Sequence, residues 1–155
     1  MSPEENPEGR KVEDMANRLE IAMTEGQKNP RANGELNDLN SMSELQELRK
    51  FRTAIVEFYR RDCPYCERLM PILEELASDY QEKVYFGRIN VDDVEDTRER
   101  FDVFGVPLVV ALKRGMPIAR IEGFHEIDVY DQWISIIHSG LRPMDVTSGL
   151  ETQML

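Results

Sequence analysis

The sequence has few of the residues that build metal centres and disulfide frameworks. Its 155 residues include 2 Cys, 2 His and 1 Trp. The cysteines are Cys63 and Cys66, so a single chain cannot form a four-thiolate zinc site, and His125 and His138 stand at no spacing typical of mixed zinc ligands. A purely structural disulfide is disfavoured as well, because closing so short a loop removes little entropy from the unfolded chain. The cysteine pair therefore needs another explanation.

The chain also lacks long apolar runs and an excess of positive charge. The longest apolar stretch, residues 106–112, is far below the ~18 residues of a membrane span, and the first residues, MSPEENPEGRK, lack the apolar segment of a secretory signal. Lys and Arg number 19 against 30 Asp and Glu, which gives a net charge of -11. This balance disfavours nucleic acids and anionic lipids as ligands. We expect a cytoplasmic protein with neither nucleic acid nor membrane as a partner.

The composition indicates one globular domain with a polar extension. With 41% hydrophobic and 8% aromatic residues, a chain of 155 residues can bury one ordinary core. Hydrophobic residues become frequent only after about residue 41. We therefore expect a polar extension over residues 1–40, a folded domain over residues 43–141 and a flexible tail over residues 142–155. Within the extension, the apolar side chains of residues 11–27 recur at helical spacing and predict one amphipathic helix.

Helical and strand patterns alternate from residue 43 onward. Ser43 and Gln46 have the spacing of a capping box and predict a helix over residues 44–50. The apolar, β-branched run of residues 54–59 predicts a buried strand, and the leucine spacing after Cys63 predicts a long helix. The later patterns predict a strand at 84–91, a short helix at 97–102, an antiparallel hairpin of 106–112 with 118–121, and a last helix at 128–139. The first two strands are joined through a helix and should be parallel.

The motif with chemical meaning is Cys63-Pro64-Tyr65-Cys66, which follows a buried strand and opens a helix. A thiol attacks disulfides as its thiolate, and a free cysteine with a pKa of ~8.5 is mostly protonated at neutral pH. At a helix N-cap, unpaired amide groups and the helix dipole stabilise the Cys63 thiolate, and Pro64 suits the first helical position because it has no N–H. Cys66 lies one turn later, within reach of Cys63. We expect an exposed, acidic Cys63 that attacks and a buried Cys66 that resolves the mixed disulfide.

This interpretation has an alternative based on metal binding. A Cys-x-x-Cys pair also supplies half of many zinc sites, and two chains could pool their thiolates around zinc or an iron–sulfur cluster. The lack of a second cysteine pair and the strand before Cys63 favour redox chemistry. We therefore expect no metal, and no cofactor beyond the redox-active pair Cys63 and Cys66.

Residues 43–141 resemble a thioredoxin-fold domain through segments that extend well beyond the cysteines. The segments similar to the family are Val56-Glu57-Phe58-Tyr59 before the motif, Pro71 in the helix after it, Arg88-Ile89-Asn90-Val91-Asp92 in the central strand, Gly105-Val106-Pro107 in the cis-proline loop, and Gly115 and Gly123 at the hairpin and the substrate groove. The resemblance implies a thioredoxin fold of the α/β class. Its mixed central sheet would combine a parallel βαβ unit with an antiparallel ββα unit between flanking helices.

The same resemblance implies an activity, partners and a proton relay. Thioredoxin-like proteins are dithiol–disulfide oxidoreductases, so we expect protein disulfides as substrates, a separate reductase as electron donor, and a monomer. Glu57 stands in the place of the family's buried acid, where a carboxylate could accept the proton of Cys66. Burial would raise the pKa of Glu57, whereas the charge of Arg88, which matches a nearby lysine of the family and whose guanidinium can hold a carboxylate in a fork, would lower it. The alternative is a Glu57 that serves only as an ion-paired strand carboxylate.

A substrate groove is implied beside the cysteines. The resemblance implies a cis peptide bond before Pro107, which would turn the backbone of Val106 toward the cysteines so that it pairs with an extended substrate. A trans proline that opens a strand is the alternative. Pro64 and Tyr65 would form a wall of the groove, and Gly123 would line it.

Two departures from the family pattern affect the expected redox behaviour. Asp62 replaces the usual tryptophan before the first cysteine, and the Pro64-Tyr65 dipeptide resembles glutaredoxins. The region after Pro107 lacks a Gly-Gly-x-Asp-like element that would hold glutathione, which favours a thioredoxin-type reductase over a glutathione-dependent glutaredoxin. A glutaredoxin-like or isomerase-type redox protein stays an alternative. An alternative from another class is a binding module that recruits a partner through residues 1–40, with the cysteines reporting the redox state.

Overall fold

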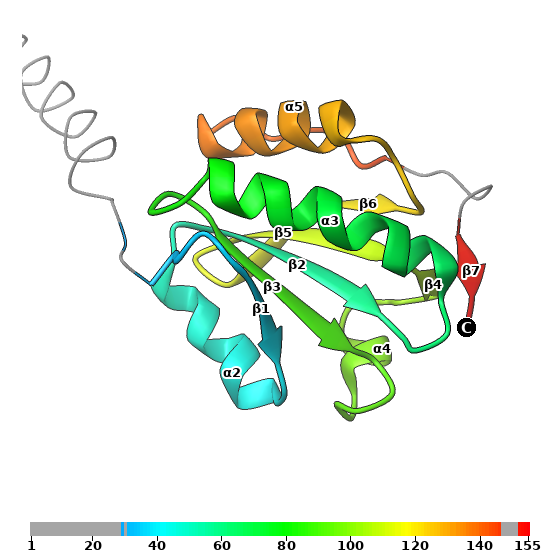
Figure 1. Cartoon of the computed structure of the whole chain (residues 1–155). Helices are drawn as coiled ribbons and strands as arrows, with labels where there is room; N and C mark the ends of the chain where they lie inside the picture. The colour runs from blue at the N-terminus through cyan, green and yellow to red at the C-terminus, as the bar shows by residue number, and fades with distance from the viewer. Residues whose placement is uncertain (1–28, 30, 147–151) are drawn as a thin grey trace, which may run out of the picture.

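The computed structural model describes residues 29, 31–146 and 152–155, and it has an α/β fold with helices on both faces of a mixed sheet (Figure 1). The sheet has 5 strands in the order β1-β3-β2-β5-β6. These strands are β1 (Leu36–Leu39), β2 (Thr53–Tyr59), β3 (Tyr85–Asn90), β5 (Leu108–Lys113) and β6 (Met116–Glu122). β1 and β2 run parallel to β3, whereas β5 is antiparallel to both β2 and β6. The mixed sheet predicted from the sequence is confirmed.

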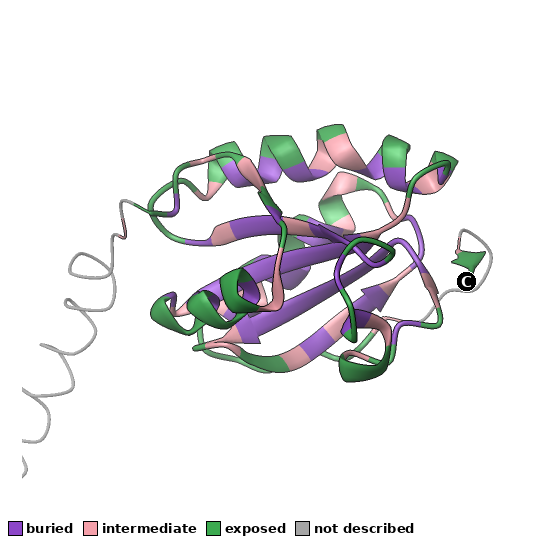
Figure 2. Ribbon diagram, turned by 90° about the horizontal axis from the view of Figure 1, so that it is seen from below, coloured by how far each residue is buried: buried purple, intermediate pink, exposed green. Residues whose placement is uncertain are grey.

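Each face of the sheet is covered by its own helices. The helices are α3 (Pro64–Asp79) and α5 (Ile127–His138) on one face, and α2 (Met42–Gln46), the 3-10 helix η1 (Glu47–Lys50) and α4 (Thr97–Arg100) on the other (Figure 1). Alternate strand residues point to opposite faces, so β2 sends Ile55 into the cluster under α3 and α5 and sends Val56 and Phe58 into the other cluster. The central strands β2, β3 and β5 are buried through most of their length, while the outer helix faces are exposed (Figure 2). Among the described residues, no helix is long and apolar enough to cross a membrane.

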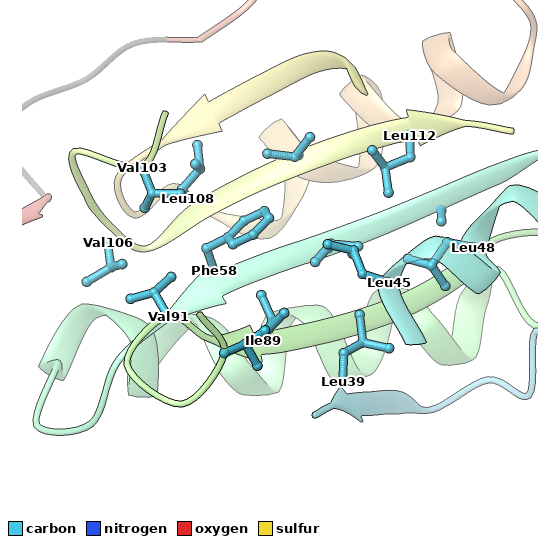
Figure 3. Close-up of a cluster of buried hydrophobic side chains, with 14 of the residues drawn as sticks. Leu39, Leu45, Leu48, Phe58, Ile89, Val91, Val103, Val106, Leu108 and Leu112 are labelled. Carbon is cyan, nitrogen blue, oxygen red and sulfur yellow. The ribbon is translucent and has the colours of Figure 1, made fainter. Parts of the chain in front are cut away.

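The hydrophobic cluster on the α2 side of the sheet extends to the cysteines. Figure 3 shows Leu45 and Leu48 at one end of this cluster and Val91 and Val106 at the other. The two cysteines belong to the same set of buried side chains. The two sulfurs are therefore connected to the packed core.

The sheet begins earlier than the sequence predicts. β1 covers residues 36–39, inside the segment expected to be a polar extension and before the domain start expected at residue 43. It is an edge strand that pairs in parallel with β3. The following helix also starts earlier, because Ser41 and not Ser43 is the N-cap, and its hydroxyl accepts the Glu44 N–H at 3.1 Å. The helix expected in residues 11–27 lies outside the described residues.

Parts of the segment expected to be a flexible tail pair with the domain. Val146 forms a parallel bridge with Ile121, and its N–H and carbonyl bond to the β6 backbone at 3.0 and 2.9 Å. Further along, β7 (Gln153–Met154) pairs antiparallel with β4 (Gly105–Val106). These contacts are made by backbone N–H and carbonyl groups. The side-chain pattern of the sequence therefore did not predict them.

Candidate active site

The two cysteines lie at the N-terminus of α3 and form a disulfide, with their Cα atoms 5.2 Å apart. Cys63 is the N-cap and Pro64 the first helical residue, which confirms the predicted placement. The Cys66 N–H donates to the Cys63 sulfur at 3.2 Å. An amide of the first helical turn, which has no partner within the helix, is thus directed at this sulfur. In the reduced protein, the same geometry brings the positive end of the helix dipole to a Cys63 thiolate.

Ion pairs with an acidic loop hold the turn before the cysteines. Asp62 has a φ of 58°, a left-handed conformation that aspartate adopts more readily than most residues, and this lets the chain turn from β2 into α3. Arg60 and Arg61 face the carboxylates of Asp92 and Asp93 at 3.6 and 2.9 Å. The positive charge of these arginines is therefore offset by partners in the loop after β3.

Both cysteines are buried. Each is 1% exposed, so the expectation of an exposed Cys63 sulfur was wrong. The physical reason is packing, because Cys63 and Cys66 belong to the same hydrophobic cluster as Val91, Val94 and Val106. A substrate disulfide needs a local rearrangement of the covering groups before it can contact Cys63.

Glu57 is fully buried on the sheet face that α3 covers. It is 0% exposed, and its register partner on the neighbouring parallel strand is Arg88. The Glu57 Oε1 and Arg88 Nε atoms are 3.6 Å apart. Neither carboxylate oxygen of Glu57 has a hydrogen-bond partner among the described residues, so the expected guanidinium fork is wrong. The pair is held by charge attraction without a hydrogen bond.

Two other side chains hold the Arg88 guanidinium. Its central carbon lies 3.6 Å from the centroid of the Tyr59 ring, and its Nη1 donates to the sulfur of Met70 at 2.9 Å. Nε is the guanidinium nitrogen that pairs with Glu57, at 3.6 Å. The positive charge still lowers the pKa of Glu57, but loss of water has the larger effect, and burial raises this pKa to about 8. Both influences expected from the sequence act on the pKa of Glu57, and burial is the larger one.

The peptide bond between Val106 and Pro107 is cis, as the resemblance implies. Gly123 lies against this loop, because its N–H donates to the Pro107 carbonyl at 2.9 Å. The Gly123 carbonyl in turn accepts the hydroxyl of Tyr130 on α5 at 3.1 Å. Gly123 has a φ of 86°, a conformation that favours glycine. Tyr130 was not predicted, because an aromatic residue on the buried face of a helix has the sequence signature of an ordinary core residue.

Pro64 and Tyr65 lie between the two cysteines in the chain and reach the surface of the domain. Pro64 is exposed and Tyr65 is partly buried. The guanidinium of Arg68 lies 5.9 Å from the centroid of the Tyr65 ring and 4.4 Å from that of Phe124. A pocket of about 500 Å³ adjoins this stack and is lined by Arg68, Phe124, His125, Glu126, Asp128 and Val129. The Arg68 stack was not predicted, because the two rings come from segments far apart in the sequence.

A pair of sulfurs that can switch between dithiol and disulfide at a helix N-terminus is suited to exchange with a second disulfide. Within the part of the chain that the structure describes, no group of three or more His, Cys, Asp or Glu side chains is placed to hold a metal ion. The fold and the site together define a thiol–disulfide exchange protein.

Known proteins are similar to this chain in sequence and in fold. The family model of thioredoxin matches residues 35–135. A thioredoxin from Staphylococcus aureus is 33% identical over 70 residues, which are 45% of this chain and 67% of that protein. A mutant thioredoxin from Halobacterium salinarum NRC-1 is similar in fold, with a TM-score of 0.63, 22% identity, and coverage of 71% of this chain and 96% of that chain. Plasmodium falciparum thioredoxin has a TM-score of 0.60, 23% identity, and coverage of 64% and 97%.

The chain belongs to the thioredoxin family. It is a thioredoxin-like dithiol–disulfide oxidoreductase.

Proposed function

We propose that the protein reduces disulfides of other proteins through two successive exchanges at Cys63 and Cys66. The Cys63 thiolate attacks a substrate disulfide, forms a mixed disulfide and releases one substrate thiolate. The Cys66 thiolate then attacks the Cys63 sulfur, which releases the second substrate thiolate and forms the Cys63–Cys66 disulfide. The dithiol thereby passes an electron pair to the substrate, and a separate reductase restores it.

The observation that carries this assignment of roles is the position of Cys63 as the N-cap of α3, with the Cys66 N–H 3.2 Å from its sulfur. A hydrogen bond and a helix dipole that favour the thiolate lower the pKa of a thiol. Cys66 lies inside the first turn of the helix and has no equivalent cap position. Cys63 is accordingly the attacking residue, and Cys66 the resolving one.

Glu57 is the proton acceptor for Cys66 in this proposal, and Arg88 positions it. A carboxyl group with a pKa of about 8 is well matched to a thiol with an ordinary pKa of ~8.5. The nearby Arg88 charge keeps a fraction of Glu57 ionised at neutral pH despite its complete burial. A buried base whose oxygens have no hydrogen-bond partner among the described residues is free to take up a proton.

The substrate groove in this proposal is the backbone of Val106 and Pro107, lined by Gly123 and walled by Pro64 and Tyr65. β4 offers its strand edge for pairing with an extended segment, as the antiparallel ladder at Gly105 and Val106 supports. The bond from Gly123 to the Pro107 carbonyl keeps the two sides of the loop together.

The working unit in this proposal is a monomer in the cytosol. The support for a monomer is that the proposed site residues, from Glu57 to Gly123, all lie within the single domain that the structure describes. The cytosolic thiol pool is poised to keep a thioredoxin-type dithiol reduced. The proposed catalytic domain runs from β1 to α5, and residues 1–28 belong to the proposed polar extension.

Reduction of insulin with dithiothreitol as electron donor tests the proposed function. The unaltered chain should accelerate the reaction, Cys63→Ser should abolish the acceleration, and Cys66→Ser should accumulate a mixed disulfide with the substrate. A binding module would instead keep its partner and show no acceleration in any variant. Equal rates for the unaltered chain and Cys63→Ser would refute the proposed chemistry.

A further inference from the structure

The substrate position beside the cis-proline loop is already filled by a segment of the same chain. β7 pairs antiparallel with β4, with Met154 opposite Gly105 and Gln153 opposite Val106 (Figure 1). The N–H of Leu155 also donates to the carbonyl of Phe104 at 3.2 Å. Residues 152–155 therefore form an added strand on the edge that the proposed function assigns to substrate.

Residues 152–155 lie close to the backbone of Gly105. A Cβ atom added to Gly105 would lie 2.5 Å from Cγ2 of Thr152 and 3.1 Å from the Gln153 carbonyl oxygen. A side chain at position 105 would force Thr152 to move and the Gln153 carbonyl to shift. The glycine thus permits backbone contact between β4 and residues 152–155.

The hydrogen-bond pattern places Val106 at the centre of this contact. In an antiparallel ladder, hydrogen-bonded pairs alternate with pairs that are not hydrogen-bonded. Because Leu155 bonds to Phe104, the next pair of the bonded kind is Gln153 with Val106. The backbone groups of Val106 that the proposed function offers to substrate are the same ones that Gln153 uses.

Residues 152–155 are less buried than the site residues near them in the fold. Gln153 and Met154 are exposed, with Met154 at 71%, so little apolar surface holds them in place. By contrast, Val106 is 0% and Cys63 1% exposed. A short ladder with few buried contacts opens more easily than a packed core. A competing strand can therefore displace residues 152–155 without unfolding the domain.

We propose that residues 152–155 are an intramolecular competitor that occupies the substrate strand position on Gly105 and Val106. A protein substrate must displace them and then pairs antiparallel with β4 in their place. This inference rests on the proposed substrate groove and deepens it, because it specifies an extended substrate segment and its direction. The displacement raises the apparent KM for protein disulfides and leaves the chemical steps at Cys63 and Cys66 unchanged.

The test compares the full chain with a variant lacking residues 152–155 and with Gln153→Pro, which removes a ladder donor. Met154→Pro is the matched control, because residue 154 belongs to the pair that is not hydrogen-bonded. Insulin reduction driven by dithiothreitol should show a KM at least about threefold lower for the deletion and for Gln153→Pro, with kcat unchanged. Met154→Pro should keep the KM of the full chain. Equal KM values for all chains would overturn the inference.

A binding measurement separates this inference from the proposed function. A capped peptide with the sequence of residues 150–155, Leu-Glu-Thr-Gln-Met-Leu, should bind the deletion variant and shift the NMR signals of the Gly105 and Val106 amides. The full chain should bind it at least about tenfold more weakly, because its own segment competes at high effective concentration. Peptide binding without insulin reduction in any chain would overturn the proposed function and support the competitor. Insulin reduction with equal peptide affinity for both chains would overturn the competitor and leave the proposed function standing.

Discussion

Glu57 and Arg88 face each other on neighbouring parallel strands, 3.6 Å apart, without a hydrogen bond between them. The guanidinium is instead stacked on Tyr59 and bonded to the sulfur of Met70. Because the carboxylate is fully buried and incompletely compensated, its pKa rises to about 8. A buried carboxyl group with a pKa of about 8 has consequences for stability and, in the proposed proton relay, for kinetics.

Glu57→Gln should slow the second exchange step while leaving the first one unchanged. The glutamine cannot accept the proton of Cys66, whereas attack by Cys63 depends on the helix N-terminus. We expect the release of substrate from the mixed disulfide to slow by roughly a hundredfold, the lower end of the range for loss of a general base. Rapid-quench measurement of single turnovers resolves the two steps.

Glu74→Gln is the matched control for that experiment, because Glu74 is an exposed carboxylate on α3. It should exchange disulfides like the unaltered chain at both steps. If Glu57→Gln also left both steps unchanged, Glu57 would have no part in proton transfer.

The free energy of unfolding should fall as the pH rises from 4.5 to about 8. The folded state keeps the Glu57 proton up to about pH 8, whereas the unfolded chain releases it near its ordinary pKa of 4.5. The stabilisation is therefore fully present below 4.5 and is lost as the pH rises through about 8. Between these two pH values, the free energy of unfolding should fall by roughly 5 kcal/mol, at ~1.4 kcal/mol per pH unit.

Urea unfolding of the oxidised protein at a series of pH values checks this dependence. Glu57→Gln removes the titrating group, so the variant should be more stable than the unaltered chain at pH 9 and should have a flatter profile. A parallel fall in stability for both chains would assign the pH dependence to other groups.

Arg88→Met should raise the pKa of Glu57 further, because it removes the one influence that lowers it. The pH range over which stability falls should move upward, and the proton-transfer step should require a higher pH. Arg61→Met, which removes an exposed arginine paired with Asp93, is the control and should leave both profiles in place. If the pH dependence of stability and of proton transfer were the same in Arg88→Met as in the unaltered chain, Arg88 would not act on Glu57.

Tyr130→Phe should loosen the groove beside Pro107. The hydroxyl of Tyr130 is the buried donor to the Gly123 carbonyl, and leaving such an acceptor without its donor costs ~1–3 kcal/mol. We expect lower stability in urea and a higher KM for insulin. Tyr80→Phe removes a more exposed hydroxyl bonded to Asp131 and should cost less. Equal stability losses in the two variants would argue against a special role for the bond to Gly123.

The side-chain pattern predicted the elements that bury apolar residues. The buried strand at Thr53–Tyr59 and the helix at Pro64–Asp79 follow from apolar runs and from the cysteine N-cap with its proline. β1 could not be predicted in this way, because Asn37 and Asp38 are poor strand formers and the strand depends on pairing with β3. β7 is shorter still and depends entirely on its backbone partner.

In the site too, features with a local sequence signature were predictable, and features that depend on distant residues were not. The positions of Cys63 and Pro64 were predictable, because a helix N-terminus has a local sequence signature. The burial of Cys63 and the orientation of Arg88 were not, because they depend on side chains distant in the sequence, including Val106 and Met70. Tertiary packing decides the pKa of Glu57 for the same reason.

The central claim is that the start of α3 makes Cys63 an acidic nucleophile. Its most direct test is the rate at which iodoacetamide alkylates Cys63 in the reduced Cys66→Ala variant, measured as a function of pH. The claim predicts that the alkylation rate has its inflection at or below about pH 7.5, in the pKa range of cysteines at helix N-termini. An inflection at ~8.5 or higher, as in an unstructured peptide, would contradict it.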